Sequence, residues 1–164
     1  MDTEDGRDTV NDFLKNDDNS EYREVETDLI WQFYVDNYMD SEVIQHLGNK
    51  SSLTFFSIGV NGGKGRGAKA LQTAINKVYE SQKAPMKVGA DGAIGRGTRK
   101  ALADLDGNGL IDDDQFNQYM LEYMDGFYKY LITNNESKYG LYKKGWRNRL
   151  VGLGFTPPQN DWVA

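Results

Sequence analysis

The sharpest chemical pattern in this sequence is a run of oxygen-bearing side chains that begins at Asp104. It reads Asp-Leu-Asp-Gly-Asn-Gly-Leu-Ile-Asp, with such side chains at the first, third and fifth positions and a glycine at the sixth. This is the spacing of an EF-hand-like calcium loop, whose seventh position binds through its backbone carbonyl. The predicted Ca²⁺ ligands are Asp104, Asp106, Asn108, Leu110, Asp112 and Gln115.

The twelfth position of this loop departs from the calcium pattern. Gln115 stands where such loops have a glutamate that binds through both oxygens, so we expect a reduced affinity. A second interpretation needs no metal. The acidic residues 112–114 then form a turn at the start of a long helix, where negative charge is favourable beside the helix dipole. Both interpretations stay open at the level of sequence.

The composition excludes several other kinds of chemistry. The 164 residues include no cysteine and one histidine, His46, which rules out disulfides, thiolate nucleophiles, Cys-ligated zinc and two-histidine metal sites. The 25 acidic and 19 basic residues leave a formal charge of −6, which argues against a protein that coats nucleic acid. We therefore expect no nucleic-acid partner.

The N-terminus has no positively charged segment followed by an apolar stretch, so we expect no signal peptide. No apolar run elsewhere approaches the ~20 residues of a membrane-spanning helix. Membrane insertion is therefore not expected.

The elements that position these residues are predicted to be helices. Apolar and aromatic side chains recur at helical spacing in three stretches, 29–38, 68–79 and 116–131. The third is the longest and is the predicted central core helix. Shorter helices are expected at 98–103, capped by Thr98, and around Trp146 and Leu150. No strand-like alternation is present, so the predicted fold class is all-α.

The expected organisation is one helical domain, residues 29–155, between two less regular ends. Residues 1–28 are acidic and are expected to form a loosely ordered lead, with the first helix capped near Thr27-Asp28. Residues 156–164 follow Gly154 and contain Pro157-Pro158, which predicts an extended tail. Ser51-Ser52 is the expected cap of a short apolar segment, and the glycine-rich stretch 61–67 is expected to be a flexible loop.

Several short motifs between about residues 29 and 153 follow one another in a familiar order. They are Phe33-Tyr34 with Tyr38-Met39-Asp40, Phe56 to Gly62, Leu71-Gln72, Asp91-Gly92-x-Ile94-Gly95-x-x-Thr98, Phe127-Tyr128 and Gly145-Trp146-x-x-Arg149. Taken together they resemble glycoside hydrolase family 108, muramidase-related proteins whose lysozyme-like domain ends in a predicted peptidoglycan-binding region. The sequence departs from the family pattern at Met39, which replaces a tryptophan, and at Ser57, which replaces an aspartate, and Gly97 is out of register with the family's proline.

The resemblance implies a lysozyme-like domain that binds the glycan strands of peptidoglycan. In an active member it also implies hydrolysis of the β-1,4 bond between N-acetylmuramic acid and N-acetylglucosamine. The family's general acid lies in an upstream Glu-Gly-Gly motif that this sequence lacks. A lysozyme-type acid needs an apolar pocket that raises its pKa. The remaining candidates for this acid are Glu4, Glu21, Glu24 and Glu26.

Three alternatives therefore stay open for the function: a muramidase, a non-catalytic wall-binding or phage virion component, and a fragment whose catalytic segment lies elsewhere. In each case the target is the bacterial cell envelope. Delivery would use a holin, a virion or a secretion machine, and phage tail or secretion-machine proteins are the expected protein partners.

The predicted substrate contacts are Asn61, Gly62, Tyr38 and Trp146. The glycines of the 61–67 stretch allow a sugar to approach the backbone, and the Asn61 amide both donates and accepts hydrogen bonds. The stretch is not a phosphate-binding loop, because Lys64 is followed by glycine and no strand precedes it. Residues 138–149 combine basic and aromatic side chains, which suits sugars and anionic wall polymers. The alternative is that Trp146 packs in the core while Lys143, Lys144 and Arg147 form a solvated face.

Overall fold

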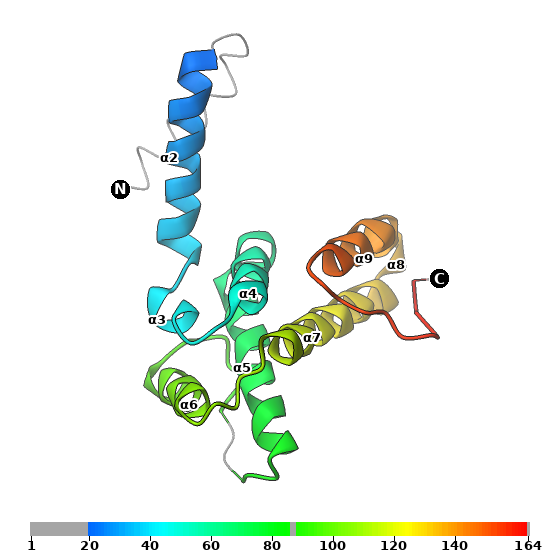
Figure 1. The fold of residues 1–164 in the computed structure, drawn as a ribbon. Coiled ribbons are helices and arrows are strands. Elements are labelled where there is room, and N and C mark those ends of the chain that lie inside the picture. Colours follow the sequence, from blue (N-terminus) through cyan, green and yellow to red (C-terminus); the bar gives the residue numbers. More distant parts are fainter. Residues whose placement is uncertain (1–19, 86–87, 164) are drawn as a thin grey trace. The chain divides into compact units, whose positions relative to one another are not determined.

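A computed structural model of the chain describes residues 20–85 and 88–163, and of residues 20–27 the backbone alone. The chain divides into two compact units, 1–40 and 41–164, and each is described by itself. The described residues contain helices and no strand (Figure 1), which confirms the all-α prediction. The helices are α2 (Ser20–Tyr38), α3 (Ser41–Ile44), α4 (Asn49–Gly62), α5 (Lys64–Ser81), α6 (Arg96–Gly107), α7 (Asp113–Asn134), α8 (Glu136–Tyr139), the 3₁₀ turn η1 (Gly140–Tyr142) and α9 (Lys143–Gly152). None of these is long and apolar enough to cross a membrane.

The first unit contains helix α2, which begins at Ser20 and not near Thr27-Asp28 as expected. The segment before Asp28 is rich in glutamate, a good helix former that is favourable near a helix N-terminus. The helix therefore extends into the acidic lead. The rings of Tyr34 and Tyr38 lie one helical turn apart, with centroids 5.9 Å from each other. Residues 1–19 lie outside the described part of the chain.

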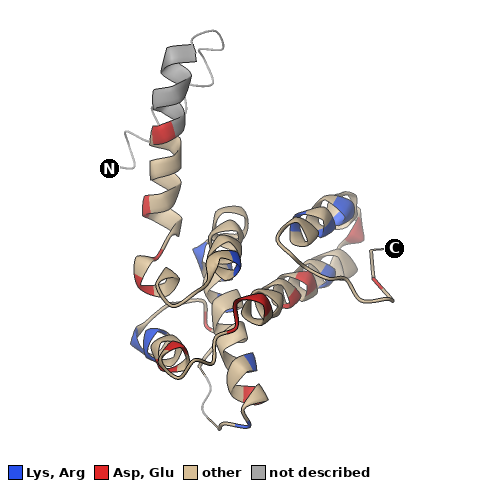
Figure 2. Cartoon of the chain, viewed as in Figure 1, with Lys and Arg blue, Asp and Glu red and all other residues tan. Residues whose placement is uncertain are grey.

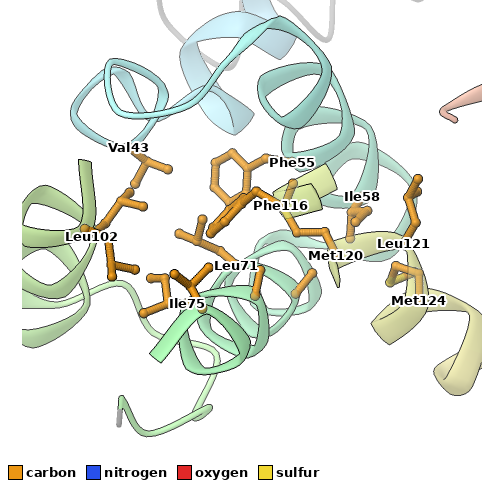
Figure 3. Close-up of a cluster of buried hydrophobic side chains, with 14 of the residues drawn as sticks. Val43, Phe55, Ile58, Leu71, Ile75, Leu102, Phe116, Met120, Leu121 and Met124 are labelled. Atoms are coloured by element: carbon orange, nitrogen blue, oxygen red, sulfur yellow. The ribbon is translucent and has the colours of Figure 1, made fainter. Parts of the chain in front are cut away.

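The second unit has its core where α4, α5 and α7 pack together (Figure 3). Leu71 and Ile75 of α5 are fully buried, and their i, i+4 spacing places both on the face toward the other two helices. The core side chains labelled in Figure 3 are Val43, Phe55, Ile58, Leu71, Ile75, Leu102, Phe116, Met120, Leu121 and Met124. Helix α7 packs against α4, α5, α8 and α9, which confirms it as the central helix.

The glycine-rich stretch is not the flexible loop that the sequence predicted. Helix α4 continues to Gly62 and α5 begins at Lys64, so a single residue, Gly63, connects them. Its φ of +93° is a conformation that favours glycine. Four residues later, a Cβ on Gly67 would lie 3.4 Å from the Cα of Gly59. The glycines therefore permit a sharp corner and a close crossing of two helices, and do not serve as a flexible linker.

Helix α4 is capped from another helix, and of the expected pair Ser51-Ser52 the Ser51 hydroxyl takes part by accepting the Gly48 N–H over 3.1 Å. Its N-cap is Gly48, which lacks a capping side chain. The Asp113 carboxylate of α7 accepts hydrogen bonds from the Ser51 amide (2.9 Å), the Ser51 hydroxyl (2.6 Å) and the Lys50 amide (3.0 Å). These amides belong to the first turn, whose N–H groups have no partner inside the helix. Asp113 thus joins the start of α7 to the start of α4.

Loss of this cap is expected to destabilise the protein in a pH-dependent manner. Burial acts to raise the pKa of Asp113, but the hydrogen bonds from Ser51 and Lys50 outweigh it and hold the pKa below 3.8. The folded pKa is thus lower than the unfolded one, so the contribution is present above pH 3.8 and is lost as the pH falls through the folded pKa. Asp113→Ala should lower the free energy of unfolding by about 1–2 kcal/mol at neutral pH.

Urea unfolding followed by circular dichroism, at pH 7 and at successively lower pH, measures this difference. The matched control is Asp114→Ala, which removes an exposed carboxylate that pairs with the Lys50 side chain at the surface. The control should change stability little. Equal losses in the two variants, or a loss for Asp113→Ala that grows toward acidic pH, would contradict the capping role.

The C-terminal tail lacks helix, as predicted, but it is anchored to α7 and α9. Arg147 is buried, with its Nη1 2.7 Å from the Asp125 carboxylate and its Nη2 paired with the Asp161 carboxylate. Trp162 donates its indole N–H to Asp125 over 2.9 Å. The guanidinium also lies 4.9 Å from the ring centroid of Phe155. Arg147 therefore does not belong to the expected solvated face, because two carboxylates and two aromatic rings enclose it.

Candidate functional site

Two of the motifs, Leu71-Gln72 and the segment 91–98, meet at a buried glutamine. The amide nitrogen of Gln72 donates to the Asp91 carboxylate (3.1 Å), the Ala93 carbonyl (2.9 Å) and the Thr98 hydroxyl (3.1 Å). Its amide oxygen accepts the N–H of Gly92 over 3.0 Å. Gln72 is fully buried, and its hydrogen bonds fix the turn that leads into α6 from the core side. The motifs lie far apart in sequence and form one structural unit.

This turn lies against the start of α5. Gly92 has a φ of +82°, and a Cβ there would approach the carbonyl oxygen of Gly65 to 3.2 Å, so only a glycine fits without strain. The N–H of Ala93 and the Gln72 amide both donate to Asp91 and lower the pKa of that carboxyl. Asp91 is therefore a stabilised, exposed carboxylate beside the corner between α4 and α5.

Arg66 connects this corner to helix α7. A Cβ added to Gly62 would lie 3.2 Å from Cγ of Arg66, so the arginine stem begins beside Gly62. Its guanidinium lies over the ring of Phe127, 3.6 Å from the centroid, and donates to the Tyr123 hydroxyl over 2.7 Å. A cation held against an aromatic face in this way is a favourable and well-oriented contact.

An aromatic stack continues from Phe127 toward helix α9. The ring centroids of Phe127 and Tyr128 are 6.2 Å apart, and Tyr128 stacks on Trp146 with centroids 4.4 Å apart and planes 15° from parallel. Tyr142 stacks on the same indole at 5.4 Å and 21°. The Tyr139 ring lies 6.0 Å from Trp146.

We call the set Arg66, Phe127, Tyr128, Trp146 and Tyr142 the aromatic strip. Its inner member, Tyr128, is 7% exposed and its outer member, Tyr142, is 47% exposed, so the strip runs from the core to the surface. Helix α9, which carries Trp146 of the strip, also carries lysine and arginine residues (Figure 2). Flat aromatic faces with adjacent polar and basic groups suit the apolar face of a pyranose ring and its polar substituents.

The structure brings together some of the predicted substrate contacts. Trp146 belongs to the aromatic strip, and Gly62 reaches the strip through Arg66. Asn61 is exposed next to Gly62 at the end of α4, and its side-chain amide donates to the Ser57 carbonyl one turn earlier over 2.9 Å. Tyr38 belongs to the other unit and is not part of the strip.

The candidate general acids cannot be assigned to the strip. Glu4 lies outside the described residues, and for Glu21, Glu24 and Glu26 only the backbone, within helix α2, is described. Their role as acids stays a prediction.

The predicted calcium loop is divided between two helices and a short connection. Helix α6 continues to Gly107, because Leu102 and Leu105 face the core and extend the helix through the first four loop positions. Gly109, with a φ of +68°, then ends the helix. Leu110 follows, and its N–H donates back to the Leu105 carbonyl over 2.9 Å.

The oxygen atoms of this segment are engaged in other contacts. Asp104 pairs with Lys100 at 2.9 Å, and Asp106 lies 2.8 Å from His46. The Asp112 carboxylate caps α7 by accepting a hydrogen bond from the backbone N–H of Gln115 over 2.9 Å. The side chain of Asn108 donates its amide to the Asp104 carbonyl over 2.7 Å. Among the described residues, no group of three or more acidic, histidine or cysteine side chains is placed to hold a metal ion. Asp112 thus caps α7, as the second interpretation has it. Calcium binding by this segment stays a prediction.

Sequence reasoning did not identify Arg66 or the supporting role of Gln72. Gln72 was part of a motif, but its burial depends on two distant segments meeting. Arg66 had no signal beyond its place in a glycine-rich stretch. Comparisons of this chain with protein-family models, with curated proteins and with solved structures found no match.

Proposed function

We propose that this protein binds the glycan strands of peptidoglycan through the aromatic strip. The observation that carries the proposal is the stack of Tyr128, Trp146 and Tyr142, which reaches the surface at Tyr142 and continues at its buried end to Phe127 and Arg66. Its members include the aromatic residues of two motifs in the family resemblance, Phe127-Tyr128 and Gly145-Trp146. The target on this proposal is the bacterial cell envelope.

The chemistry of the strip suits an N-acetylated sugar polymer. The exposed face of Tyr142 offers an apolar platform for a pyranose ring. The Asn61 amide, at the exposed end of α4, offers a polar partner for hydroxyl or acetamido groups.

Hydrolysis of the glycan is the alternative activity. A muramidase needs a protonated carboxyl on one side of the scissile bond and a second carboxylate on the other. The candidate acids are the glutamates of the acidic lead, and none of them is assigned to the aromatic strip. We therefore propose binding, and not hydrolysis, as the function. A role in a phage virion, or as one part of a longer enzyme, is compatible with the same binding surface.

The test is co-sedimentation of the purified chain with insoluble peptidoglycan, run alongside dye release from labelled peptidoglycan. Tyr142→Ala removes the outer face of the strip and should weaken binding about threefold to tenfold. The matched control is Tyr130→Ala, which removes a tyrosine of α7 that is 63% exposed. Failure of the unaltered chain to sediment, or equal effects of the two substitutions, would overturn the proposal. Dye release above the blank would establish hydrolysis.

Calcium binding at residues 104–115 stays a proposal from the sequence pattern. The helical arrangement predicts that it is weak, with a dissociation constant of about 1 mM or more, because the last turn of α6 would have to unwind. Isothermal titration with calcium chloride measures it, with Asp106→Asn as the comparison. Micromolar binding that this substitution abolishes would show that the loop pattern outweighs the helix.

A further inference from the structure

An open pocket of about 550 Å³ lies between α3 and α6, outside the aromatic strip. It is lined by Glu42, Gln45, His46, Gly95, Arg96, Arg99, Lys100 and Ala103. Gly95 lies at the end of the turn that Gln72 supports, so part of the segment 91–98 lines the pocket. Nothing in the proposed glycan binding uses it.

One wall of the pocket is a row of three cations. Arg96, Arg99 and Lys100 stand at positions i, i+3 and i+4 of α6, which places them on one face of the helix. Figure 2 shows this concentration of basic residues on α6, in a chain whose formal charge is −6. A carboxylate or phosphate is the ligand that paired guanidinium groups recognise best.

The protein's own carboxylates neutralise these cations only in part. Glu42 of α3 pairs with Arg99 at 3.1 Å, and Lys100 pairs with Asp104 at 2.9 Å. Arg96 forms no ion pair with any described residue. The Glu42 side chain is 70% exposed, and such a surface pair is weak, so an incoming carboxylate can displace it from Arg99.

His46, on the opposite wall, is held by Asp106 at 2.8 Å. The pocket therefore contains a neutralised side and a cationic side. The cationic side consists of Arg96, Arg99 and Lys100 of α6.

We propose that the pocket between α3 and α6 binds the carboxylates of peptidoglycan's peptide stems, with Arg96 and Arg99 as the recognising residues. The inference rests on the proposed function, since it assigns a second site for the same polymer. The sugar backbone is uncharged, whereas the stems carry free carboxylates. The aromatic strip therefore binds the sugar faces, and this pocket binds the charged substituents.

The experiment uses the full chain and two separate soluble ligands: a synthetic stem pentapeptide without sugar, and uncharged oligosaccharides of β-1,4-linked N-acetylglucosamine. Titration calorimetry should show that Arg96→Gln weakens pentapeptide binding about tenfold, the effect of one charge-assisted contact. Glu42→Gln should tighten it, because it removes a negative charge from the pocket wall beside Arg99. Lys129→Gln, which removes an exposed cation of α7, is the matched control and should change nothing.

Three results would overturn the inference: no pentapeptide binding, equal binding of a pentapeptide whose carboxylates are amidated, or displacement of the pentapeptide by equimolar inorganic phosphate. The last result would define a general anion site. Loss of oligosaccharide binding in Tyr142→Ala, with pentapeptide binding unchanged, separates the two sites. Failure of oligosaccharide binding in the unaltered chain counts against the aromatic strip and not against the pocket.

Discussion

Replacing Arg147 with methionine is expected to lower the free energy of unfolding by about 3 kcal/mol, because it leaves two carboxylates facing each other without their cation. Asp125 and Asp161 are 16% and 18% exposed, so water screens them poorly. Methionine fills much of the arginine stem's volume between Phe155 and Trp162 but supplies no charge. The tail that carries Trp162 should then detach from α7.

Chemical unfolding gives the loss of stability, and the NMR resonance of the Trp162 indole N–H, which donates to Asp125, reports release of the tail. Arg149→Met is the matched control, because Arg149 is an exposed cation of the same helix. It should leave both measurements nearly unchanged. A similar loss in the two variants would mean that net charge, and not the buried ion pairs, is responsible.

Replacing Gln72 with leucine is expected to lower the free energy of unfolding by about 2–4 kcal/mol, since each of its four hydrogen bonds is lost at once. Leucine has nearly the same volume but neither donor nor acceptor, so the Thr98 hydroxyl and the Gly92 amide are left without their partner. The turn at Asp91 can rehydrate, because that residue is exposed, and this limits the loss.

Urea unfolding measures the loss, and hydrogen exchange at the Gly92 amide reports the turn itself. Gln82→Leu is the control, because Gln82 is an exposed glutamine just beyond the same helix α5. Faster exchange at Gly92 is expected in Gln72→Leu alone. Unchanged exchange there would contradict the supporting role of Gln72.

The central helix shows what sequence pattern predicts well. Phe116, Met120 and Met124 recur at intervals of four, and burial of that stripe is favourable whichever helices cover it. The helix was therefore predictable from its own residues. Its N-terminal cap, in contrast, extends to another helix, since Asp113 binds the first turn of α4. No local pattern reports which distant amides a carboxylate will meet.

In the candidate site, too, some residues were predicted from the sequence, whereas the contacts between them depend on packing. Trp146 and Gly62 were predicted from sequence, but their connection through Arg66 and Phe127 depends on how α5 crosses α7. The calcium pattern at Asp104 stays a prediction from spacing. In the structure its first four positions belong to α6, and the Asp104 and Asp106 carboxylates lie beside Lys100 and His46.

The sequence by itself determined the all-α class, the stripes of α5 and α7 and the absence of thiol chemistry, because these depend on composition and on periodicity within a single segment. Only the tertiary structure decided that Gly63 makes a corner, that Arg147 is buried between two carboxylates, and that Gln72 supports a turn beyond its own helix. The physical reason is that each of these depends on the distance between groups far apart in the chain. That distance is set by packing of the whole core and not by the local preference of any residue.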